Sequence, residues 1–209
     1  IIADDNTKAG YLFDKIQKKY SFIDITKKKS SIDVLVILGG DGFMLHTIHK
    51  FLDQKIKFYG INCGTLGFLL NDFSKNDLVK NIQSSQNTII HPLQMSAVTA
   101  DNKTHNFLAI NEVSLLRETR QSANIAIEID GSVKVNNLIG DGLLVASAAG
   151  SGAYNFSVKG PIFPLSSDLL ALTPISPFRP RQWRGALLPG KTNFKFTIND
   201  SVKRPVSAV

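Results

Sequence analysis

The sequence has very little cysteine. Its 209 residues include one, Cys63, so a disulfide network within the chain and a zinc site built from several cysteines are excluded. This cysteine usage is typical of a reducing compartment, and we expect a cytoplasmic protein. Because no histidine lies near Cys63 at metal-ligand spacing, we interpret it as a packed small side chain.

Long apolar runs are also missing. The longest are interrupted by glycine or polar residues well before the ~20 residues that a helix needs to cross a bilayer, so no membrane association is predicted. Residues 1–3 are apolar without a methionine, and residues 205–209 have the composition of a strand start. We therefore expect the natural chain to be longer than this sequence.

Negative charge is in the minority, since 24 lysines and arginines against 17 acidic residues give a net charge of +7. Nucleic acid, acidic lipid or a multiply anionic small substrate could each use such a surface. Lysines cluster at Lys15, Lys18, Lys19 and residues 27–29, but no aromatic residues alternate with them at base-stacking spacing. We interpret them as a solvated basic surface and predict no nucleic-acid partner.

Hydrophobic periodicity divides the chain near residue 92. Before it, short branched apolar segments alternate with segments of helical spacing, which predicts an N-terminal α/β domain with a parallel sheet over residues 1–92. The expected strands are residues 1–3, 33–38 and 57–61, and the expected helical stripes are Ala9, Leu12, Phe13, Ile16 and Tyr20, then Leu45, Ile48 and Leu52.

After residue 92 the sequence becomes rich in residues that favour strands. Alternating or β-rich segments occur at 107–116, 123–129 and 193–198, and Asp130-Gly131 is a hairpin turn signal. Residues 93–209 are therefore predicted to form a mainly β C-terminal domain.

The stretch GGDG, residues 39–42, joins an apolar segment to an amphipathic helical pattern. Glycines at such a turn let phosphate approach the backbone, and a helix start offers free N–H groups. Neither GxxxxGK[ST] nor GxGxxG is present. The carboxylate of Asp41 would repel phosphate unless it binds Mg²⁺ or accepts a proton from an attacking hydroxyl. Alternatively, Asp41 N-caps a helix that begins at Phe43, and spacing alone does not decide between the two.

Asn111 and Glu112 place an amide and a carboxylate together after the short apolar run FLAI. Such a pair suits ribose hydroxyls and the edge of a base. The alternative is a turn or bulge whose polar side chains are exposed, because asparagine often marks turns.

Small residues crowd around Tyr154 within residues 140–162. They would let a ligand lie against the backbone, and Ser151 and Ser157 add hydroxyls. The alternative is a tightly packed corner between a strand and a helix.

The segment FRPRQWRGALL, residues 178–188, gathers Arg179, Arg181, Arg184 and Trp183. Arginine with tryptophan can clamp phosphate or stack on a base. Without other evidence we favour a surface loop held by arginine stacking.

Taken together, these motifs resemble the NAD kinase family, whose members transfer the γ-phosphoryl group of ATP to the adenosine-ribose 2′-hydroxyl of NAD. GGDG alone is shared with lipid and sphingoid kinases and with phosphofructokinases. The other segments are more specific, and the resemblance covers nearly the whole chain: GINCGTLGFL at 60–69, NEV at 111–113, DGLLVASAAGSGAYNFSVKGPI at 141–162 and KRPVSAV at 203–209.

The resemblance implies a role for each matching position. Asp41 matches the proton-accepting aspartate, Gly42 lines the site beside it, and His46 matches a basic position that faces the dinucleotide. Asn111 and Glu112 match the pair that holds NAD, and Asp141 matches a nicotinamide-side contact. The matching adenosine-binding segment contains Gly152, Ala153, Tyr154 and Ser157.

The resemblance also implies Mg²⁺ or another divalent cation, with ATP or polyphosphate as the phosphoryl donor. It implies an N-terminal α/β domain, a C-terminal β domain, and a homodimer or homotetramer with active sites at the subunit interface.

The chain departs from the family pattern at three positions. Phe43 follows GGDG where threonine is usual, Gly152 stands where threonine is common, and Ala148 stands where proline is common. Losing the hydroxyl at position 152 would cost about 0.5 to 1.5 kcal/mol, or about tenfold in NAD affinity at most. Two alternatives stay open: a lipid or sphingoid-type kinase that shares GGDG, and a catalytically silent nucleotide-binding regulator.

Overall fold

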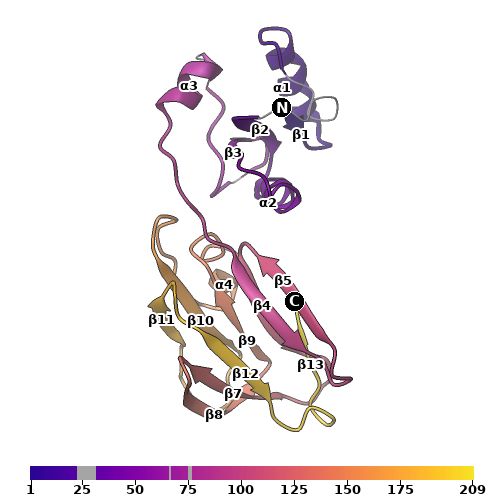
Figure 1. The fold of residues 1–209 in the computed structure, drawn as a ribbon, viewed down its shortest axis with the longest axis vertical. Helices are drawn as coiled ribbons and strands as arrows, with labels where there is room; N and C mark the ends of the chain where they lie inside the picture. The colour runs from indigo at the N-terminus through magenta and orange to yellow at the C-terminus, as the bar shows by residue number, and fades with distance from the viewer. Residues whose placement is uncertain (23–31, 66, 75–76) are drawn as a thin grey trace. The chain divides into compact units, whose positions relative to one another are not determined.

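The computed structural model describes residues 1–22, 32–65, 67–74 and 77–209. The chain forms two compact units, Ile1–Asn87 and Thr88–Val209 (Figure 1). The lysines at 27–29 and Leu66 of GINCGTLGFL lie outside the described residues. No helix in the described part of the chain is long and apolar enough to cross a membrane.

The first unit is built on a parallel sheet, as the sequence predicts. Within its described residues three strands pair in the order β1-β2-β3, with Ile2 beside Ile37 and Ile37 beside Gly60. The elements in chain order are β1 (Ile2–Ala3), α1 (Thr7–Gln17), β2 (Val34–Gly39), α2 (Asp41–Lys50), β3 (Lys57–Asn62) and α3 (Leu78–Ser84).

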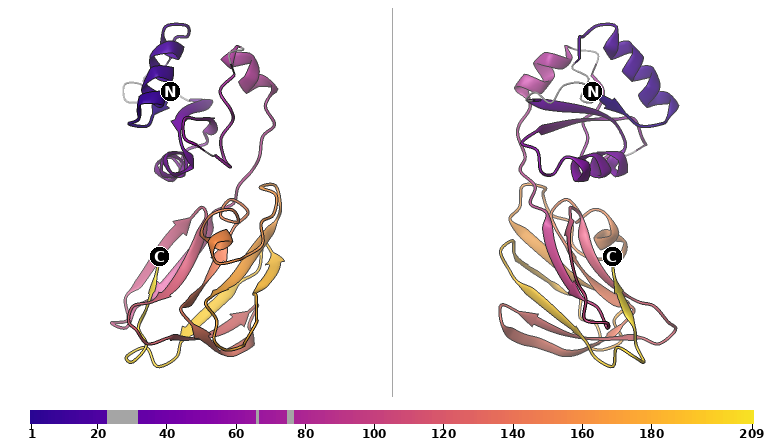
Figure 2. Two further views of the ribbon diagram at one scale, coloured as in Figure 1. Left: turned by 180° about the vertical axis from the view of Figure 1, so that it is seen from behind. Right: turned by 45° about the vertical axis from the view of Figure 1, so that its right-hand side comes forward.

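Strand β2 is buried on both faces because a helix covers each one. Val36 and Leu38 pack in the cluster that contains the α1 side chains. The alternate residues, Leu35 and Ile37, are also buried and point to the opposite face. Figure 2 shows α1 and α2 on opposite sides of this sheet.

The apolar stripes of the two helices differ in how well the sequence predicted them. The α1 stripe of Ala9, Leu12 and Ile16 is confirmed, although the helix ends before Tyr20. The α2 stripe is wrong in detail: the buried side chains are Met44, Thr47 and Ile48. Helix α2 ends at Lys50, so Leu52 lies beyond it.

The second unit is mainly β, which confirms the predicted fold class. Its described strands form antiparallel sheets with the orders β11-β10-β9-β6-β13, β12-β7-β8 and β4-β5. The elements are β4 (Leu93–Val98), β5 (Thr104–Ala109), β6 (Glu112–Arg117), β7 (Ala123–Ile129), β8 (Ser132–Gly140), β9 (Gly142–Ala146), α4 (Tyr154–Ser157), β10 (Leu169–Ile175), β11 (Ala186–Pro189), β12 (Phe194–Ile198) and β13 (Val206–Ala208).

The core of this unit is formed by residues from facing sheets. Ile125 and Ile127 of β7 pack with Leu143 and Val145 of β9 and with Leu172 of β10. Each of these side chains is buried. The alternation predicted at 123–129 therefore marks the buried face of β7.

The hairpin predicted at Asp130-Gly131 is confirmed. Both residues have positive φ, 48° and 77°, and they connect Ile129 to its partner Ser132. Positive φ at both central positions matches the twist of the flanking strands, which is why this dipeptide favours hairpins.

Candidate functional site

Asp41 is the first residue of α2, and its carboxylate bonds to a distant loop. Gly40 is the N-cap residue, so the alternative that Asp41 caps a helix beginning at Phe43 is wrong. The Asp41 Oδ2 atom accepts from the Phe68 N–H at 2.8 Å and Oδ1 accepts from the Leu69 N–H at 3.1 Å. The carboxylate is thus oriented at the carboxyl end of β2, the edge where ligands bind to parallel sheets.

The three glycines around Asp41 differ in how much space the fold leaves for a side chain. A Cβ at Gly39 would meet the Phe43 ring at 2.7 Å, so packing requires glycine there. A Cβ at Gly40 or Gly42 would meet no protein atom within 4 Å. Gly40 has φ −101° and ψ 177°, which any residue can adopt. Internal packing therefore does not explain why these two positions lack a side chain.

His46 and Gly42 lie on one face of α2. They are four residues apart, which places them above one another on the helix surface, and both are exposed. Asp41, Gly42 and His46 therefore all lie within the first six residues of α2.

Asn111 and Glu112 lie where the chain passes from β5 to β6. The main chain at Asn111 is held from two sides, because the Ser147 N–H donates to its carbonyl at 2.8 Å and the Ser147 hydroxyl donates to the Ile110 carbonyl at 2.6 Å. Gly150 packs directly against the Asn111 carbonyl and leaves no room for a Cβ. These contacts therefore fix residues 147–150 relative to the start of β6.

The side chains of Asn111 and Glu112 each carry a buried oxygen without a partner. Within the described residues, Asn111 Oδ1 and Glu112 Oε2 accept no hydrogen bond. Burial raises the pKa of the Glu112 carboxyl above its ordinary value. The alternative is right that Asn111 lies at a bend, but it is wrong about exposure, because both side chains are half-buried and each has one buried oxygen. Leaving buried polar atoms unpaired costs free energy unless a ligand satisfies them.

The raised pKa of Glu112 predicts a stability difference that depends on pH. A carboxyl with a raised folded-state pKa favours folding below its unfolded pKa and loses that contribution as pH rises through the folded pKa. We expect Glu112→Gln to melt at a higher temperature than the wild type near pH 8 without ligand. This gain in melting temperature should vanish below about pH 4, where the carboxyl of the unfolded chain is also protonated.

The control is Glu128→Gln, which removes a carboxylate that faces Lys195 at 3.7 Å on the surface. Thermal unfolding followed by circular dichroism across pH measures both variants. A Glu112→Gln melting gain of equal size at every pH would contradict the prediction.

Residues 140–162 turn around the buried side chain of Asn155. The sequence predicted this segment as either a binding surface or a packed corner. The Thr173 hydroxyl donates to Asn155 Oδ1 at 2.6 Å, and Asn155 Nδ2 donates to the carbonyls of Ser151 at 3.2 Å and Pro161 at 2.8 Å. Gly160 packs against the same amide, where a Cβ would clash. The corner is therefore tightly packed on its inner side.

The outer side of this corner presents the other predicted residues. Gly152, Ala153 and Tyr154 are half-buried, and Ser157 is exposed. Ser151 differs from the prediction, since it is buried and its hydroxyl donates to the Ala148 carbonyl at 2.9 Å. Its hydroxyl is thus used within the fold.

Asp141 does not lie beside Asn111 and Glu112. It sits before β9, next to Arg117 at the end of β6, whereas Glu112 pairs with Ala146 at the other end. The two positions are five residue steps apart along β6, roughly 17 Å. The predicted residues of the second unit therefore form two groups.

Residues 178–185 of the arginine-rich segment form a surface loop, and residues 186–188 belong to β11. The guanidinium carbons of Arg179 and Arg181 lie 5.7 and 5.6 Å from the centre of the Phe178 ring. Trp183 packs against the core of the second unit. The predicted surface loop held by arginine stacking is therefore confirmed for residues 178–185, whereas the loop prediction is wrong for residues 186–188 because they pair with β10.

Cys63 is buried, and burial raises the pKa of its thiol. Its Sγ lies 3.6 Å from the Ile61 carbonyl. This confirms that Cys63 is a packed side chain.

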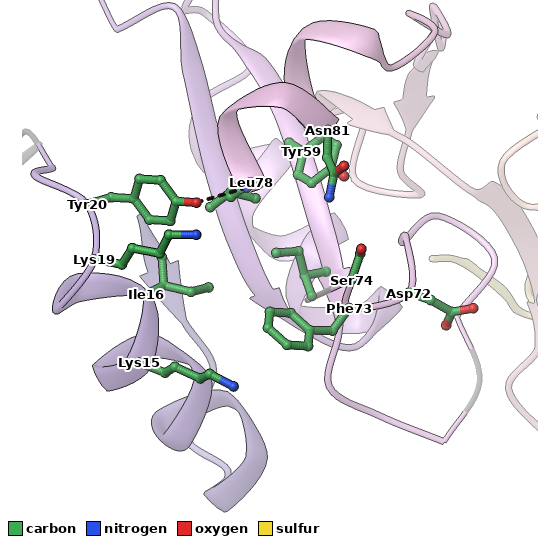
Figure 3. A pocket seen from close by; sticks show the side chains of 11 residues that line it. Lys15, Ile16, Lys19, Tyr20, Tyr59, Asp72, Phe73, Ser74, Leu78 and Asn81 are labelled. Carbon is green, nitrogen blue, oxygen red and sulfur yellow. Dashed lines mark hydrogen bonds between the residues drawn. The ribbon is translucent and has the colours of Figure 1, made fainter. Parts of the chain in front are cut away.

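A cavity of about 160 Å³ opens in the first unit between α1 and the segment that leads into α3 (Figure 3). Ile16 and Phe73 contribute apolar surface, and Lys15, Lys19 and Asp72 contribute charges of both signs. The volume is below the roughly 300 Å³ at which ligand pockets begin. None of the predicted site residues lines it, so this cavity is separate from the candidate site.

In the described residues, no three histidine, cysteine, aspartate or glutamate side chains gather to hold a metal ion. Magnesium, however, is commonly bound through one or two carboxylates together with substrate phosphates. Asp41, beside two glycines that face open space, fits that arrangement and does not fit a cage made only of protein ligands.

The sequence reasoning missed three contributions to the site. The N–H groups of residues 68 and 69 fix Asp41, Thr173 fixes Asn155, and Arg117 contacts Asp141. Backbone donors leave no sequence signal.

Comparison with known sequences shows similarity over both units. The ATP-NAD kinase N-terminal domain family matches residues 14–90. The NAD kinase of Rickettsia bellii is 44% identical over 208 residues, covering 100% of this chain and 80% of the relative. The NAD kinase of Caulobacter vibrioides is 52% identical over 176 residues, covering 84% of this chain and 68% of the relative.

Two solved structures are similar in fold. Yeast NADH kinase, solved with NADH, superposes with a TM-score of 0.68 at 27% identity, covering 86% of this chain and 53% of the yeast chain. An NAD kinase from Archaeoglobus fulgidus, solved with ATP, gives a TM-score of 0.72 at 22% identity, covering 99% of this chain and 84% of that one. At 22% identity, the similarity to the Archaeoglobus fulgidus structure shows the fold alone.

Proposed function

Because the chain belongs to the NAD kinase family and its function is that of an NAD kinase, we propose that it transfers the γ-phosphoryl group of ATP to the 2′-hydroxyl of the adenosine ribose of NAD. The oxygen–phosphorus bond to the ribose forms as the bond between the γ-phosphorus and ADP breaks. The products are NADP and ADP, and the reaction class is phosphoryl transfer to an alcohol.

Asp41 is the general base of this proposal. Each of its oxygens already accepts one backbone N–H, and a carboxylate oxygen can accept a second hydrogen bond. The proton of the attacking hydroxyl passes to this oriented carboxylate. The observation that carries the proposal is this fixed carboxylate beside Gly40 and Gly42, whose positions face open space.

The phosphates of ATP would approach along Gly40 and Gly42, with His46 presenting a basic group on the same helix face. A divalent cation, Mg²⁺, would be held by Asp41 and the phosphates, and it supplies charge neutralisation during transfer. Positioning and charge neutralisation provide most of the catalysis in such reactions, so few protein groups are needed.

The second unit would bind NAD. The unpaired oxygens of Asn111 and Glu112 suit donors of the ribose or the adenine base, since they are buried acceptors. Gly152, Ala153, Tyr154 and Ser157 would contact the adenosine, and Asp141 the nicotinamide end. We assign catalysis to residues 1–92 and NAD binding to residues 93–209.

The remaining parts of the proposal follow from the family. We propose a cytoplasmic homodimer or homotetramer that uses ATP or polyphosphate as the donor. The buried polar pair Asn111 and Glu112 favours a dinucleotide over the lipid acceptor of other GGDG kinases.

The test is NADP formation from NAD, ATP and Mg²⁺, followed with an NADP-specific dehydrogenase. We expect turnover in the range of about 1 to 100 per second that is typical of phosphoryl-transfer enzymes. Absence of NADP, combined with NAD binding in a calorimeter, would contradict catalysis and support the silent regulator. Omitting Mg²⁺ should abolish the signal.

A further inference from the structure

Arg117 forms an ion pair with Asp141 and has no role in the proposed function. The Arg117 Nε atom donates to Asp141 Oδ1 at 2.5 Å. The other side of the guanidinium is also occupied, since Nη1 donates to the Thr119 carbonyl at 2.7 Å. Two contacts on a planar group fix its orientation, and with it the orientation of the carboxylate.

The backbone of Asp141 is held without the help of this side chain. The Arg117 N–H donates to the Asp141 carbonyl at 2.9 Å, and the Asp141 N–H donates to the Ile175 carbonyl at 2.9 Å. Gly140 and Gly142, on either side, pack against neighbouring backbone. Because these contacts already fix the Cα atom of Asp141, the Arg117 guanidinium contributes only the orientation of the Asp141 carboxylate.

Stability does not explain the pair. The side chains of Arg117 and Asp141 are 34% and 42% exposed, and an ion pair with this exposure contributes little to folding. Only Oδ1 is used, and Oδ2 accepts no hydrogen bond from any described residue. The arrangement therefore offers one oriented acceptor to a molecule outside the chain.

We propose that Arg117 is a positioning residue that aims Asp141 at the carboxamide of the nicotinamide ring and thereby selects NAD over its carboxylate analogue. The inference rests on the proposed function, in which Asp141 contacts the nicotinamide end. An ionised aspartate accepts a hydrogen bond from the amide NH₂. It repels the carboxylate that replaces the amide in nicotinic acid adenine dinucleotide, so the pair discriminates by charge.

The test compares Arg117→Met and Arg117→Lys with the wild type on both dinucleotides. For Arg117→Met we expect KM for NAD to rise about fivefold to tenfold, as for the loss of one oriented hydrogen bond, with kcat within about twofold. The preference for NAD over the acid analogue should fall by a similar factor. Arg117→Lys keeps the positive charge but can reach only one of the two acceptors. Its KM for NAD and its preference for NAD should therefore lie between those of the wild type and of Arg117→Met.

Asp141→Asn is the complementary variant. It removes the repelling charge and leaves the positive charge of Arg117 without a negative partner, so the acid analogue should bind more tightly to this variant than to the wild type. The matched control is Lys195→Met, which breaks the surface ion pair with Glu128 at 3.7 Å and should leave the preference unchanged.

The outcomes separate the inference from the function on which it rests. Dissociation constants measured in a calorimeter give the preference even without turnover, so an inactive wild type contradicts the proposed function alone. The positioning role is overturned if Arg117→Met and Arg117→Lys keep the wild-type preference. It is also overturned if they weaken the binding of both dinucleotides equally.

Discussion

Replacing Asp41 with asparagine is expected to lower kcat for NADP formation by about 10²- to 10⁴-fold, the contribution of a positioned general base. The amide keeps one oxygen that can accept from the Phe68 or Leu69 N–H, so the loop at 67–69 loses one of its two bonds to α2. NAD affinity should change little. Steady-state kinetics and calorimetry measure the two effects separately.

A second carboxylate in the same unit provides the control for the lost backbone bond. Asp77 caps α3 by accepting from the N–H groups of Val79 at 2.9 Å and Lys80 at 3.4 Å. Asp77→Ala removes both of these bonds, so it should reduce stability by about 0.5 to 2 kcal/mol and keep kcat. If Asp41→Asn keeps wild-type kcat while losing stability like Asp77→Ala, Asp41 fastens the loop and is not the base.

Replacing Asn155 with leucine should strongly destabilise the second unit. Asn155 is fully buried, and its amide satisfies the Thr173 hydroxyl and the carbonyls of Ser151 and Pro161. Leaving buried polar groups unpaired costs about 1 to 3 kcal/mol each, so we expect a loss of about 3 kcal/mol or more. Urea unfolding measures the change in midpoint.

A double-mutant cycle tests the cause of that loss. Thr173→Val replaces the hydroxyl with a methyl group, and combining it with Asn155→Leu removes both partners of one hydrogen bond. The double variant should be less destabilised than the sum of the single variants. Asn106→Leu, at an exposed position in β5, should change stability by less than about 0.5 kcal/mol. Additive losses would show that packing alone, not hydrogen bonding, sets the cost.

The fold could be predicted where the signal was local. The buried run of β2 and the positive-φ dipeptide at 130–131 depend on residues that are adjacent in sequence. The start of α2 was misplaced because its evidence is not local. The Asp41 side chain turns away from its own helix to bond to N–H groups 27 and 28 residues later, and a capping pattern cannot detect such a contact.

The site was predictable in composition but not in arrangement. The segments that carry Asp41, Asn111 and Tyr154 were identified from their small and polar residues. Their supports were not, because Asn155 and Thr173 are 18 residues apart and Arg117 and Asp141 are 24 apart. Pairing of this kind depends on strand register, which a single sequence does not determine.

The close fit of Gly150 against the Asn111 carbonyl limits how this enzyme could be redesigned. Any side chain at position 150 would displace the main chain of Asn111, so that position offers no freedom to a library of variants. Gly152 and Ser157 lie on the outer side of the same corner, half-buried and exposed. Altered dinucleotide preference should therefore be sought by varying these two positions on an unchanged backbone.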